Sequence, residues 1–467
     1  MLATSNTKEL SNAIHSDEKS LLRQLWMICF PLMLTALSGS LMSFLDRVLL
    51  AKYDTDAMIV ATTAGNIAYI FQFGAMSIAM IAEVFVGQYN GAKQFRNVGK
   101  PVWQMIWFSL VCALLMMIMG FFGQSFFIPE ELGIEGYDYF KWMMVFGGSY
   151  PLVGALTGFF IGRGHVKAIA MSVIFSNLLN LILASLLVFG VEGIVPELGA
   201  QGAAIATGVS ELCVAIGLFI FFLKPKYQKL YNTHLWKFES KLFFKCIKVG
   251  FPNSIGHMAG TAAWAFVMYI LANRSIEHVT VITIGFSIWM LFSFITEGLQ
   301  MGVTAFASNF IGAKRWDKVS EVLMTGLRLQ FILAMILAIP LVIYPNLLVK
   351  FFIPLDNSAS DISHLRELIE MSCLWLWLGY VFDGMAWVID GILTAAGDTQ
   401  FIMFMNSFGT WLLCIMPIYL FVVVLDGSPM LTMKLVTLFC FILFGCYFLR
   451  YKSKKWKNNS LISVSEG

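Results

Sequence analysis

The chain has 467 residues, of which 58% are hydrophobic and 13% charged, and its formal net charge is +3 at pH 7. This composition, with a mean hydropathy of +0.77, excludes a soluble globular protein of this length. It is typical of an all-α, polytopic membrane protein.

The first twenty residues are polar and mixed in charge, which does not suit a cleavable signal peptide. The first hydrophobic run is therefore expected to remain as a helix. The eight cysteines lie mostly inside apolar runs and show no metal-ligand spacing. We expect free thiols, no disulfide framework, no metal site and no cofactor.

A membrane-spanning helix needs about 20 mainly apolar residues, and twelve runs meet that rule. In chain order they cover roughly 25–51, 57–87, 102–127, 139–162, 167–190, 200–223, 242–272, 279–310, 325–353, 368–395, 400–425 and 430–449. An even number of spans places both termini on one side of the membrane.

Basic residues predict which side that is. Of the 31 Lys and Arg, 24 fall in the two tails and the even-numbered loops, and seven fall on the other side. Because cytoplasmic loops carry the excess of Lys and Arg, both termini are expected in the cytoplasm, with the protein in the cytoplasmic (inner) membrane.

The longest basic connection lies at the middle of the chain, where it separates six predicted helices from six. The predicted parts are a cytoplasmic tail (1–24), an N-lobe (25–223), a cytoplasmic linker (224–241), a C-lobe (242–449) and a second cytoplasmic tail (450–467).

The two halves also repeat. Phe30-Pro31 and Phe251-Pro252 are 221 residues apart, as are Gly91-Ala92-Lys93 and Gly312-Ala313-Lys314. Later in each half the spacing becomes 233, which matches Gly158 with Gly391, and an insertion around 356–367 accounts for the change. Parallel repeats of six helices predict two pseudo-symmetric lobes with a V-shaped cavity between them, which move by rocking.

Asp46 is the first candidate site residue, because it lies inside the first apolar run. A carboxylate at hydrocarbon depth costs at least a few kcal/mol, so it normally faces a protein interior or an aqueous path. The alternative is an outer-interface pair with the adjacent Arg47 and no role in transport.

A second set of polar residues falls in the second half. Asp383 and Asp390 are seven apart and share a helix face, which suits attraction of cations or proton transfer; Asp390 could instead cap or solvate a helix end. Glu297, Gln300 and Thr304 form another stripe. Glu297 is interpreted either as a substrate carboxylate or as a buried partner of His257, and His257 itself as an interior residue or a proton relay.

Pro31 and Pro252 lie near the starts of equivalent apolar runs. Proline frees a backbone carbonyl within a span, so both are candidate hinges.

The order of these landmarks resembles the multidrug and toxic compound extrusion (MATE) family, closest to its NorM-like bacterial branch. The resemblance covers about residues 20–450. It is carried by Asp46, Gly87-Gln88-Tyr89-Asn90-Gly91-Ala92-Lys93, Gly162-Arg163-Gly164, Asn180, Gly199-Ala200-Gln201-Gly202-Ala203-Ala204-Ile205-Ala206-Thr207, Gly312-Ala313-Lys314 and Ala396-Gly397-Asp398-Thr399.

The resemblance implies export of organic cations and amphipathic drugs in exchange for H⁺ or Na⁺, with a coupling site on Asp46, Asn180 and Thr207. Helix directions allow these three residues to lie at similar depth. Two residues that the family commonly has are missing here. Ala184 stands where the family has a further acid or Asn, and Gly260 stands where it has an acid in the seventh helix. Asp383 matches the acid of the tenth helix.

The predicted function is a secondary antiporter, expected to act as a monomer, working by alternating access with no enzymatic activity. H⁺ is slightly favoured because Ala184 offers no oxygen ligand. The rivals are a lipid-linked saccharide flippase, a dedicated metabolite exporter, and a membrane-embedded transferase using His257. Nucleotide-driven pumping is not predicted, because the sequence contains no Gly-x-x-x-x-Gly-Lys segment followed by Ser or Thr.

Overall fold

The computed structural model describes residues 18–352, 360–459 and 461–462. Its α-helices are α2 (Glu18–Tyr53), α3 (Thr55–Ala79), α4 (Ala82–Gly91), α5 (Gly99–Phe122), α6 (Gln124–Phe127), α7 (Gly133–Val145), α8 (Ser149–Ile161), α9 (Val166–Phe189), α10 (Gly199–Phe222), α11 (Pro225–Tyr231), α12 (Ser240–Ala272), α13 (Ile276–Gly312), α14 (Trp316–Ala338), α15 (Pro345–Phe352), α16 (Ser360–Ala395), α17 (Thr399–Phe404), α18 (Met416–Ile418) and α19 (Pro429–Lys452). Short 3₁₀ segments are η1 (Phe95–Asn97), η2 (Glu130–Leu132) and η7 (Lys455–Asn458); π-helical turns are η3 (Ile339–Ile343), η4 (Met405–Gly409), η5 (Trp411–Ile415) and η6 (Tyr419–Val424).

Within these residues, twelve helical stretches are long and apolar enough to cross a membrane, which confirms the predicted number. Most lie within a few residues of their predicted places. Three do not: the third begins at Phe95 and the fourth at Glu130, seven and nine residues before their predicted starts, and the ninth spans Trp316–Ile343, about nine residues earlier than expected. The first turns of the ninth span carry Asp317, Lys318 and Glu321, so a rule based on apolar length predicts a start that is too late. The span ends before Tyr344, because Pro345 disfavours helical backbone at the residue that precedes it.

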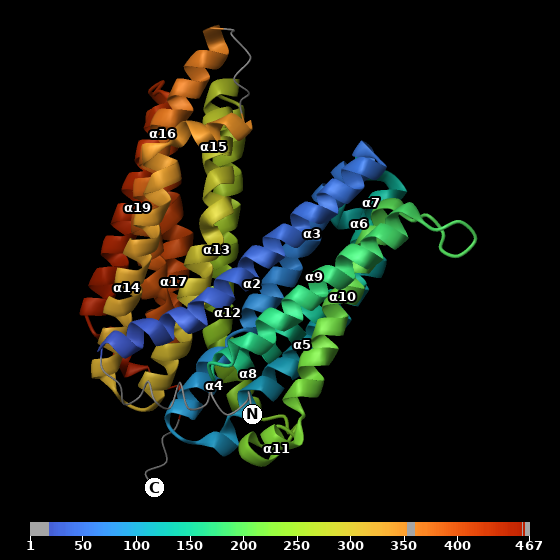
Figure 1. Ribbon diagram of the computed structural model, residues 1–467, viewed down its shortest axis with the longest axis vertical. Helices are drawn as coiled ribbons and strands as arrows, with labels where there is room; N and C mark the ends of the chain where they lie inside the picture. The colour runs from blue at the N-terminus through green and yellow to red at the C-terminus, as the bar shows by residue number, and fades with distance from the viewer. Residues whose placement is uncertain (1–17, 353–359, 460, 463–467) are drawn as a thin grey trace.

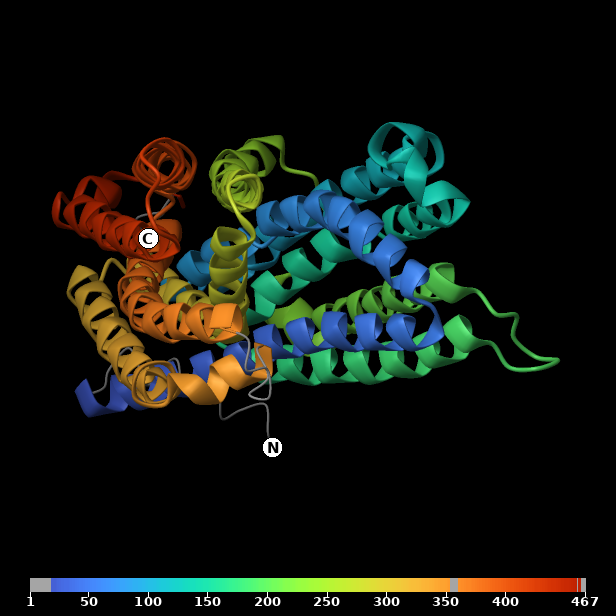
Figure 2. The ribbon, with the colours of Figure 1, turned by 90° about the horizontal axis from the view of Figure 1, so that it is seen from above.

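The spans form two bundles that diverge from a common base (Figure 1). α2 to α10 make the N-lobe and α12 to α19 the C-lobe; in Figure 2 the two groups lie side by side along the molecule, except that the first turns of α2 lie among the C-lobe helices. The predicted two-lobe, V-shaped arrangement is therefore present. The predicted N-terminal tail falls largely on residues 1–17, and part of the 356–367 insertion and of the C-terminal tail also lies outside the described residues.

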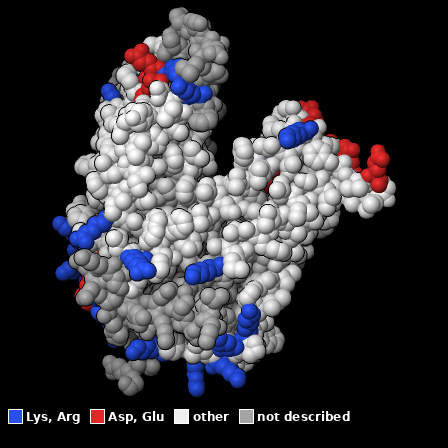
Figure 3. Space-filling model, viewed as in Figure 1, with Lys and Arg blue, Asp and Glu red and all other residues white. Residues whose placement is uncertain are grey.

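Charge is distributed unevenly along the V. In Figure 3, Lys and Arg gather toward the closed base, whereas Asp and Glu lie mainly at the two tips. We call these the basic end and the acidic end. The cleft opens toward the acidic end.

The lobes are joined by a symmetric pair of helix contacts. α2 packs on α13, where Gly298 and Gly302 lie directly against Met33 and Cys29. The matching contact joins α12 to α3, where the Ser254 hydroxyl donates to the Gly74 carbonyl over 2.9 Å. Small residues let the backbones approach closely, which is how membrane helices associate without a hydrophobic driving force.

Below these contacts, α4 and α13 cross at the basic end. Gly91 faces the Asn309 backbone and Gly312 faces the Gln88 backbone, with no room for a Cβ at either glycine. The Asn90 amide donates to Asn309 Oδ1 over 2.7 Å. This basal junction (Gln88, Asn90, Gly91, Asn309 and Gly312) closes the V.

The sequence repeat reappears as repeated helix ends. Lys93 and Lys314 follow α4 and α13 with left-handed φ angles of 59° and 57°. In each case the next backbone N–H closes the turn onto a carbonyl five residues earlier, Gln94 onto Tyr89 and Arg315 onto Phe310. Gly164 and Gly397 end α8 and α16 in the same way, with φ of 74° and 77°.

The basal loops are anchored differently in the two lobes. In the N-lobe, Arg163 is buried with its guanidinium 3.6 Å from the Phe159 ring centroid and 4.6 and 4.7 Å from the rings of Tyr227 and Tyr231 on α11. Burial lowers the pKa of Arg163. Burial and the Arg163 charge lower the pKa of the adjacent His165 to about 4.

In the C-lobe, the anchor is an ion pair. Arg450 binds the buried Asp398 through two hydrogen bonds of 2.7 and 2.9 Å. The chain beyond α19 folds back below this pair, where Trp456 is 1% exposed and Leu461 packs on Gly397.

Pro31 and Pro252 lie in the interiors of α2 and α12, a dozen residues after each helix begins. Both helices continue unbroken through the proline. The hinge assignment stays a prediction.

Candidate functional site

The first candidate site lies inside the N-lobe, where α2, α9 and α10 pack together. Asn180 Nδ2 donates to Thr207 Oγ1 over 3.0 Å, and Thr207 Oγ1 donates to Asp46 Oδ2 over 3.2 Å. Asn180 is 1% exposed and Thr207 8%. The structure therefore brings together the three residues that the family resemblance grouped and that helix directions allowed at similar depth.

This chain of donors ends on an incompletely paired carboxyl group. Asp46 Oδ1 is buried and, within the part of the chain the structure describes, has no hydrogen-bond partner. Arg47 is exposed and forms no ion pair with Asp46 among the described residues. The alternative interpretation of Asp46 as half of an interfacial pair is therefore wrong.

Ala184 is fully buried on α9, one turn beyond Asn180. A hard cation such as Na⁺ prefers several oxygen ligands around it. Here Asn180 turns its amide nitrogen, not its oxygen, toward Thr207, and Ala184 supplies no oxygen. The arrangement suits a proton on Asp46 better than a metal ion.

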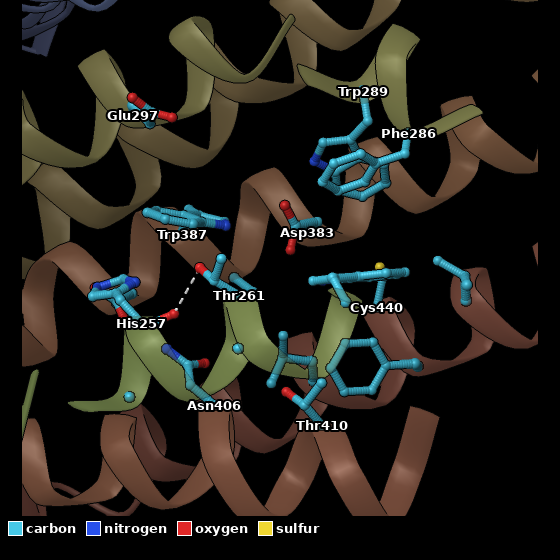
Figure 4. Close-up of a pocket in the computed structure, with 18 of the residues that line it drawn as sticks. His257, Thr261, Phe286, Trp289, Glu297, Asp383, Trp387, Asn406, Thr410 and Cys440 are labelled. Atoms are coloured by element: carbon cyan, nitrogen blue, oxygen red, sulfur yellow. Dashed lines mark hydrogen bonds between the residues drawn. The ribbon is translucent and has the colours of Figure 1, made fainter. Parts of the chain in front are cut away.

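The second candidate site is a cavity of about 320 Å³ in the C-lobe. Its wall includes the aromatic residues Trp264, Phe286, Trp289, Trp387, Phe439 and Tyr447 and the polar residues His257, Thr261, Glu297, Asp383, Asp390, Asn406 and Thr410. Phe73 of α3 also lines it, so the cavity reaches the boundary between lobes. In Figure 4, Asp383 lies between Trp387 and the Phe286–Trp289 pair.

Asp390 is the most deeply held carboxyl group of this cavity, with 4% exposure. Its Oδ1 accepts from Gln300 Nε2 at 2.9 Å and from Thr394 Oγ1 at 3.2 Å. Its Oδ2 lies 3.4 Å from the Tyr447 hydroxyl. The alternative interpretation of Asp390 as a capping or solvated residue is wrong, because three helices enclose it.

The pairing of Glu297 with His257, one of the two interpretations that the sequence left open, is not present among the described contacts. The His257 ring stacks on Trp387, with centroids 5.5 Å apart, while Glu297 is exposed on another part of the wall (Figure 4). The His257 carbonyl accepts from Thr261 at 3.1 Å. Both side chains face the cavity but do not form a unit.

Among the cavity residues that sequence reasoning missed are Trp387, Asn406 and Tyr447. Trp387 shares the helix face of Asp383 and Asp390, four residues after the first. Asn406 is a lone amide inside the eleventh apolar run, and Tyr447 a hydroxyl inside the twelfth. Each is a polar group at membrane depth and could have been found by the rule that singled out Asp46.

The two sites offer carboxyl groups, hydroxyls and aromatic faces, which can bind protons and organic cations. Among the described residues, no group of three or more His, Cys, Asp or Glu side chains is placed to hold a metal ion.

Comparisons with known proteins agree with this description. The MatE family model matches residues 31–186 and 254–420. A probable multidrug resistance protein, YoeA of Bacillus subtilis, is 21% identical over 413 residues, covering 85% of this chain and 86% of that one. A probable multidrug resistance protein NorM of Photorhabdus laumondii is 24% identical over 402 residues, with 84% and 85% covered.

A solved structure shows the same fold. It is the outward-facing conformation of a multidrug resistance MATE family transporter of the MOP superfamily, and it superposes with a TM-score of 0.83 over 98% of this chain and 100% of that one, at 15% identity.

Proposed function

Because the chain belongs to the MATE family of multidrug efflux transporters, we propose that it is a secondary antiporter that exports organic cations in exchange for protons. The observation that carries the proposal is the buried Asp46 carboxyl, which accepts from Thr207 at one oxygen and leaves the other unpaired among the described residues. A carboxyl group in this position changes its interactions when it gains a proton. It can therefore favour one arrangement of the lobes when protonated and the other when charged.

The preference for H⁺ over Na⁺ follows from the ligand count around Asp46. A proton needs one oxygen, whereas a Na⁺ ion would need oxygens that Ala184 cannot supply and that Asn180 turns away. Coupling requires only that proton and substrate favour different states, and the two need not touch.

The C-lobe cavity supplies the proposed substrate site. Aromatic walls bind flat apolar molecules, and Asp383, Asp390 and Glu297 give the wall an acidic character that attracts positive charge. A lipid-linked saccharide carries a pyrophosphate and would need basic residues here. No Lys or Arg lines the cavity within the described residues, which disfavours the flippase alternative.

Orientation follows from the charge distribution. We place the basic end in the cytoplasm of a bacterial inner membrane, so the V opens outward and the basal junction closes the cytoplasmic side. The protein is proposed to act as a monomer, since each chain contains both sites and the cleft.

The test is dye efflux from proteoliposomes that contain the purified protein, driven separately by a pH gradient and by a Na⁺ gradient, for wild type and Asp46→Asn. We expect ethidium efflux with the pH gradient only, and its loss in the variant. Asp56→Asn is the matched control, since Asp56 is an exposed acid of the acidic end. Efflux of equal rate in Asp46→Asn would contradict the coupling role, and efflux with the Na⁺ gradient alone would contradict the choice of ion.

A further inference from the structure

Glu83 is a buried acid that belongs to neither candidate site. It lies in the first turn of α4, two turns before Gly91 of the basal junction, and is 4% exposed. Its Oε1 atom is buried and, within the part of the chain the structure describes, accepts no hydrogen bond. None of the ion pairs of the described residues includes Glu83. A carboxylate here would lose its hydration and gain no partner, so a neutral carboxyl group suits the position better.

The matching residue of the C-lobe shows what this position requires. Thr304 of α13 follows Glu83 by the repeat spacing of 221 residues. Its hydroxyl donates to the Gln300 carbonyl at 2.9 Å and to the Gly391 carbonyl at 3.2 Å. The C-lobe therefore places a hydrogen-bond donor between two backbone carbonyls.

The corresponding carbonyls of the N-lobe, by the 221- and 233-residue spacings, are those of Ala79 and Gly158. The Glu83 N–H donates to the Met80 carbonyl, three residues back, and not to that of Ala79, four back. Gly158 lies directly against Glu83, since a Cβ added there would be 2.8 Å from the Glu83 nitrogen. A neutral carboxyl group can donate to such oxygens as a hydroxyl does, whereas a carboxylate can only accept.

The second span changes its helical geometry at Glu83. Between α3 and α4, the N–H groups of Ile81, Glu83 and Val84 each donate three residues back, over 3.2, 2.9 and 3.1 Å. Hydrogen bonds of this 3₁₀ type inside a long helix often mark a functional hinge. The short helix α4 can therefore move relative to α3 as a unit.

The same short helix holds the lobes together at the base. The Gln88 side-chain amide of α4 donates to the Ala395 carbonyl of α16 over 2.8 Å. The Asn90 amide, also on α4, donates to Asn309 of α13 over 2.7 Å. A movement of α4 at the Glu83 hinge would break both contacts and open the basal junction.

We propose that Glu83 is a proton-operated latch of the basal junction, neutral while α4 packs on α13 and ionised when α4 moves away and water enters. In the orientation proposed above, this water is cytoplasmic. A charged Glu83 must regain a proton before the base can close. Because the proton is lost and regained on the same side, the latch adds nothing to the protons exchanged for substrate, and instead makes opening depend on cytoplasmic pH. The inference rests on the proposed function only for this place in the transport cycle.

The other titratable groups near α4 lie on the helices that pack on it. On α13 the one nearest the junction along the chain is Glu297, two turns before Thr304. The described set is Glu277, His278 and Glu297 of α13, Tyr150 of α8, Lys100 and Cys112 of α5, Arg96 of η1, Tyr89 of α4, Asp56 and Tyr69 of α3, and Asp390 of α16, five residues before the Ala395 that Gln88 contacts. Because Glu83 is not the sole acid of this region, mutation has to assign the pH response of the base.

The first experiment is hydrogen–deuterium exchange of the purified full-length protein, without substrate or gradient, followed by mass spectrometry at several pH values. Opening of the base exposes the amides of α4 and of the last turns of α13, so their protection, corrected for the intrinsic rate at each pH, reports the closed fraction. We expect this protection to fall as pH rises, by up to about tenfold per pH unit for the loss of one proton. Peptides of α9, which packs on α2 and α10, are the internal reference.

Variants assign the response to Glu83. Glu83→Thr copies Thr304 and supplies a donor that does not ionise, so its base should stay protected at every pH; Glu83→Gln is expected to do the same and serves if the first variant does not fold. Glu83→Asp and Asp46→Asn should keep the pH dependence. The proposal would be overturned by a wild-type base with no pH dependence, by one that persists in Glu83→Thr and Glu83→Gln, or by one that Asp46→Asn alone removes.

The second experiment separates the latch from the antiport proposal. Glu83→Thr should bind ethidium as tightly as wild type, because the C-lobe cavity is unchanged, but its efflux turnover should fall by about tenfold or more, because its base rarely opens. If wild type shows no gradient-driven efflux while exchange at the base depends on Glu83, the antiport proposal fails and the latch stands. Proton-driven efflux of equal turnover in Glu83→Thr and wild type would leave the antiport proposal standing and overturn the latch.

Discussion

Asp46 in the N-lobe and Val267 in the C-lobe occupy matching positions of α2 and α12, 221 residues apart. The reverse holds on α8 and α16, where Thr157 matches Asp390 under the 233-residue spacing, and on α3 and α13, where Ala79 matches Gln300. The lobes therefore share their turns and glycine contacts but place polar groups on different helices. The two lobes thus share a backbone pattern, and each places its buried polar residues in a different candidate site.

The largest expected effect comes from moving a carboxyl group to the matching place in the other lobe. Val267 is 1% exposed and belongs to the hydrophobic core, so Val267→Asp buries an acid among apolar side chains. We expect a loss of stability of the order of 5 kcal/mol, seen as a large fall in the melting temperature in detergent.

Asp46→Val is the matched control, since it removes the N-lobe acid and should abolish efflux while the melting temperature changes little or rises. If Val267→Asp were as stable as the wild type, the cost of burying an acid at this position would not explain why the C-lobe lacks one there.

Removing the two arginines that anchor the basal loops, Arg450 in the C-lobe and Arg163 in the N-lobe, should cost different amounts of stability. Arg450→Met leaves the buried Asp398 carboxylate without its partner, and we expect a loss of about 3 kcal/mol in stability. Arg163→Met leaves no unpaired charge and keeps an apolar stem among the rings of Tyr227 and Tyr231, so its cost should be about 1 kcal/mol. Melting temperatures of the two variants give the comparison; equal losses would contradict it.

His165 should make the N-lobe base sensitive to acid. Its pKa is lowered from the ordinary value of 6.5, which applies to the unfolded chain, to about 4 in the folded protein, so the unfolded chain takes up a proton first as pH falls. Stability is then fully present above about pH 6.5 and is lost toward pH 4, by roughly 3 kcal/mol. His165→Gln should flatten that part of the stability profile.

The C-lobe loop provides the comparison. Its residue that matches His165 is Asp398, which is paired with Arg450, so this position has no histidine to take up a proton. A profile unchanged in His165→Gln would assign the acid sensitivity to other groups.

Where the lobes are alike, mutations should act alike. Lys93 and Lys314 hold left-handed backbone that favours glycine, so Lys93→Gly and Lys314→Gly should each raise stability by up to about 1 kcal/mol. Thermal melting of the single and double variants would show equal and additive gains. Lys248→Gly, at an exposed position in the interior of α12, is the control that should destabilise.

The sequence was sufficient for the number of spans and the two lobes, because apolar length and repeat spacing are local or periodic signals. The grouping of Asp46 with Asn180 and Thr207 came from the family resemblance, and helical rise showed only that the three residues could lie at similar depth. The sequence placed the ninth span late because polar residues occupy the first turns of α14. It could not place the partners of Asp390, since Gln300 lies on α13, 90 residues away, and Tyr447 on α19. Contacts between helices so distant in the chain depend on packing angles that no periodicity records.

The same limit explains His257. The sequence offered Glu297 as one possible partner of His257, whereas the structure stacks the His257 ring on Trp387. The aromatic ring is one of many in the chain, and nothing in its sequence context marks it as the partner.

The crossing of α4 and α13 at the basal junction also provides a direct reporter of lobe motion. Lys93 and Lys314 lie just beyond the two crossing ends and both side chains are exposed. A pair of spin labels at these positions would be close together in the arrangement seen here and would separate when the junction opens. The dipolar coupling between the labels would give the distribution of distances between them, and its change with pH and substrate would report when the basal junction opens during transport.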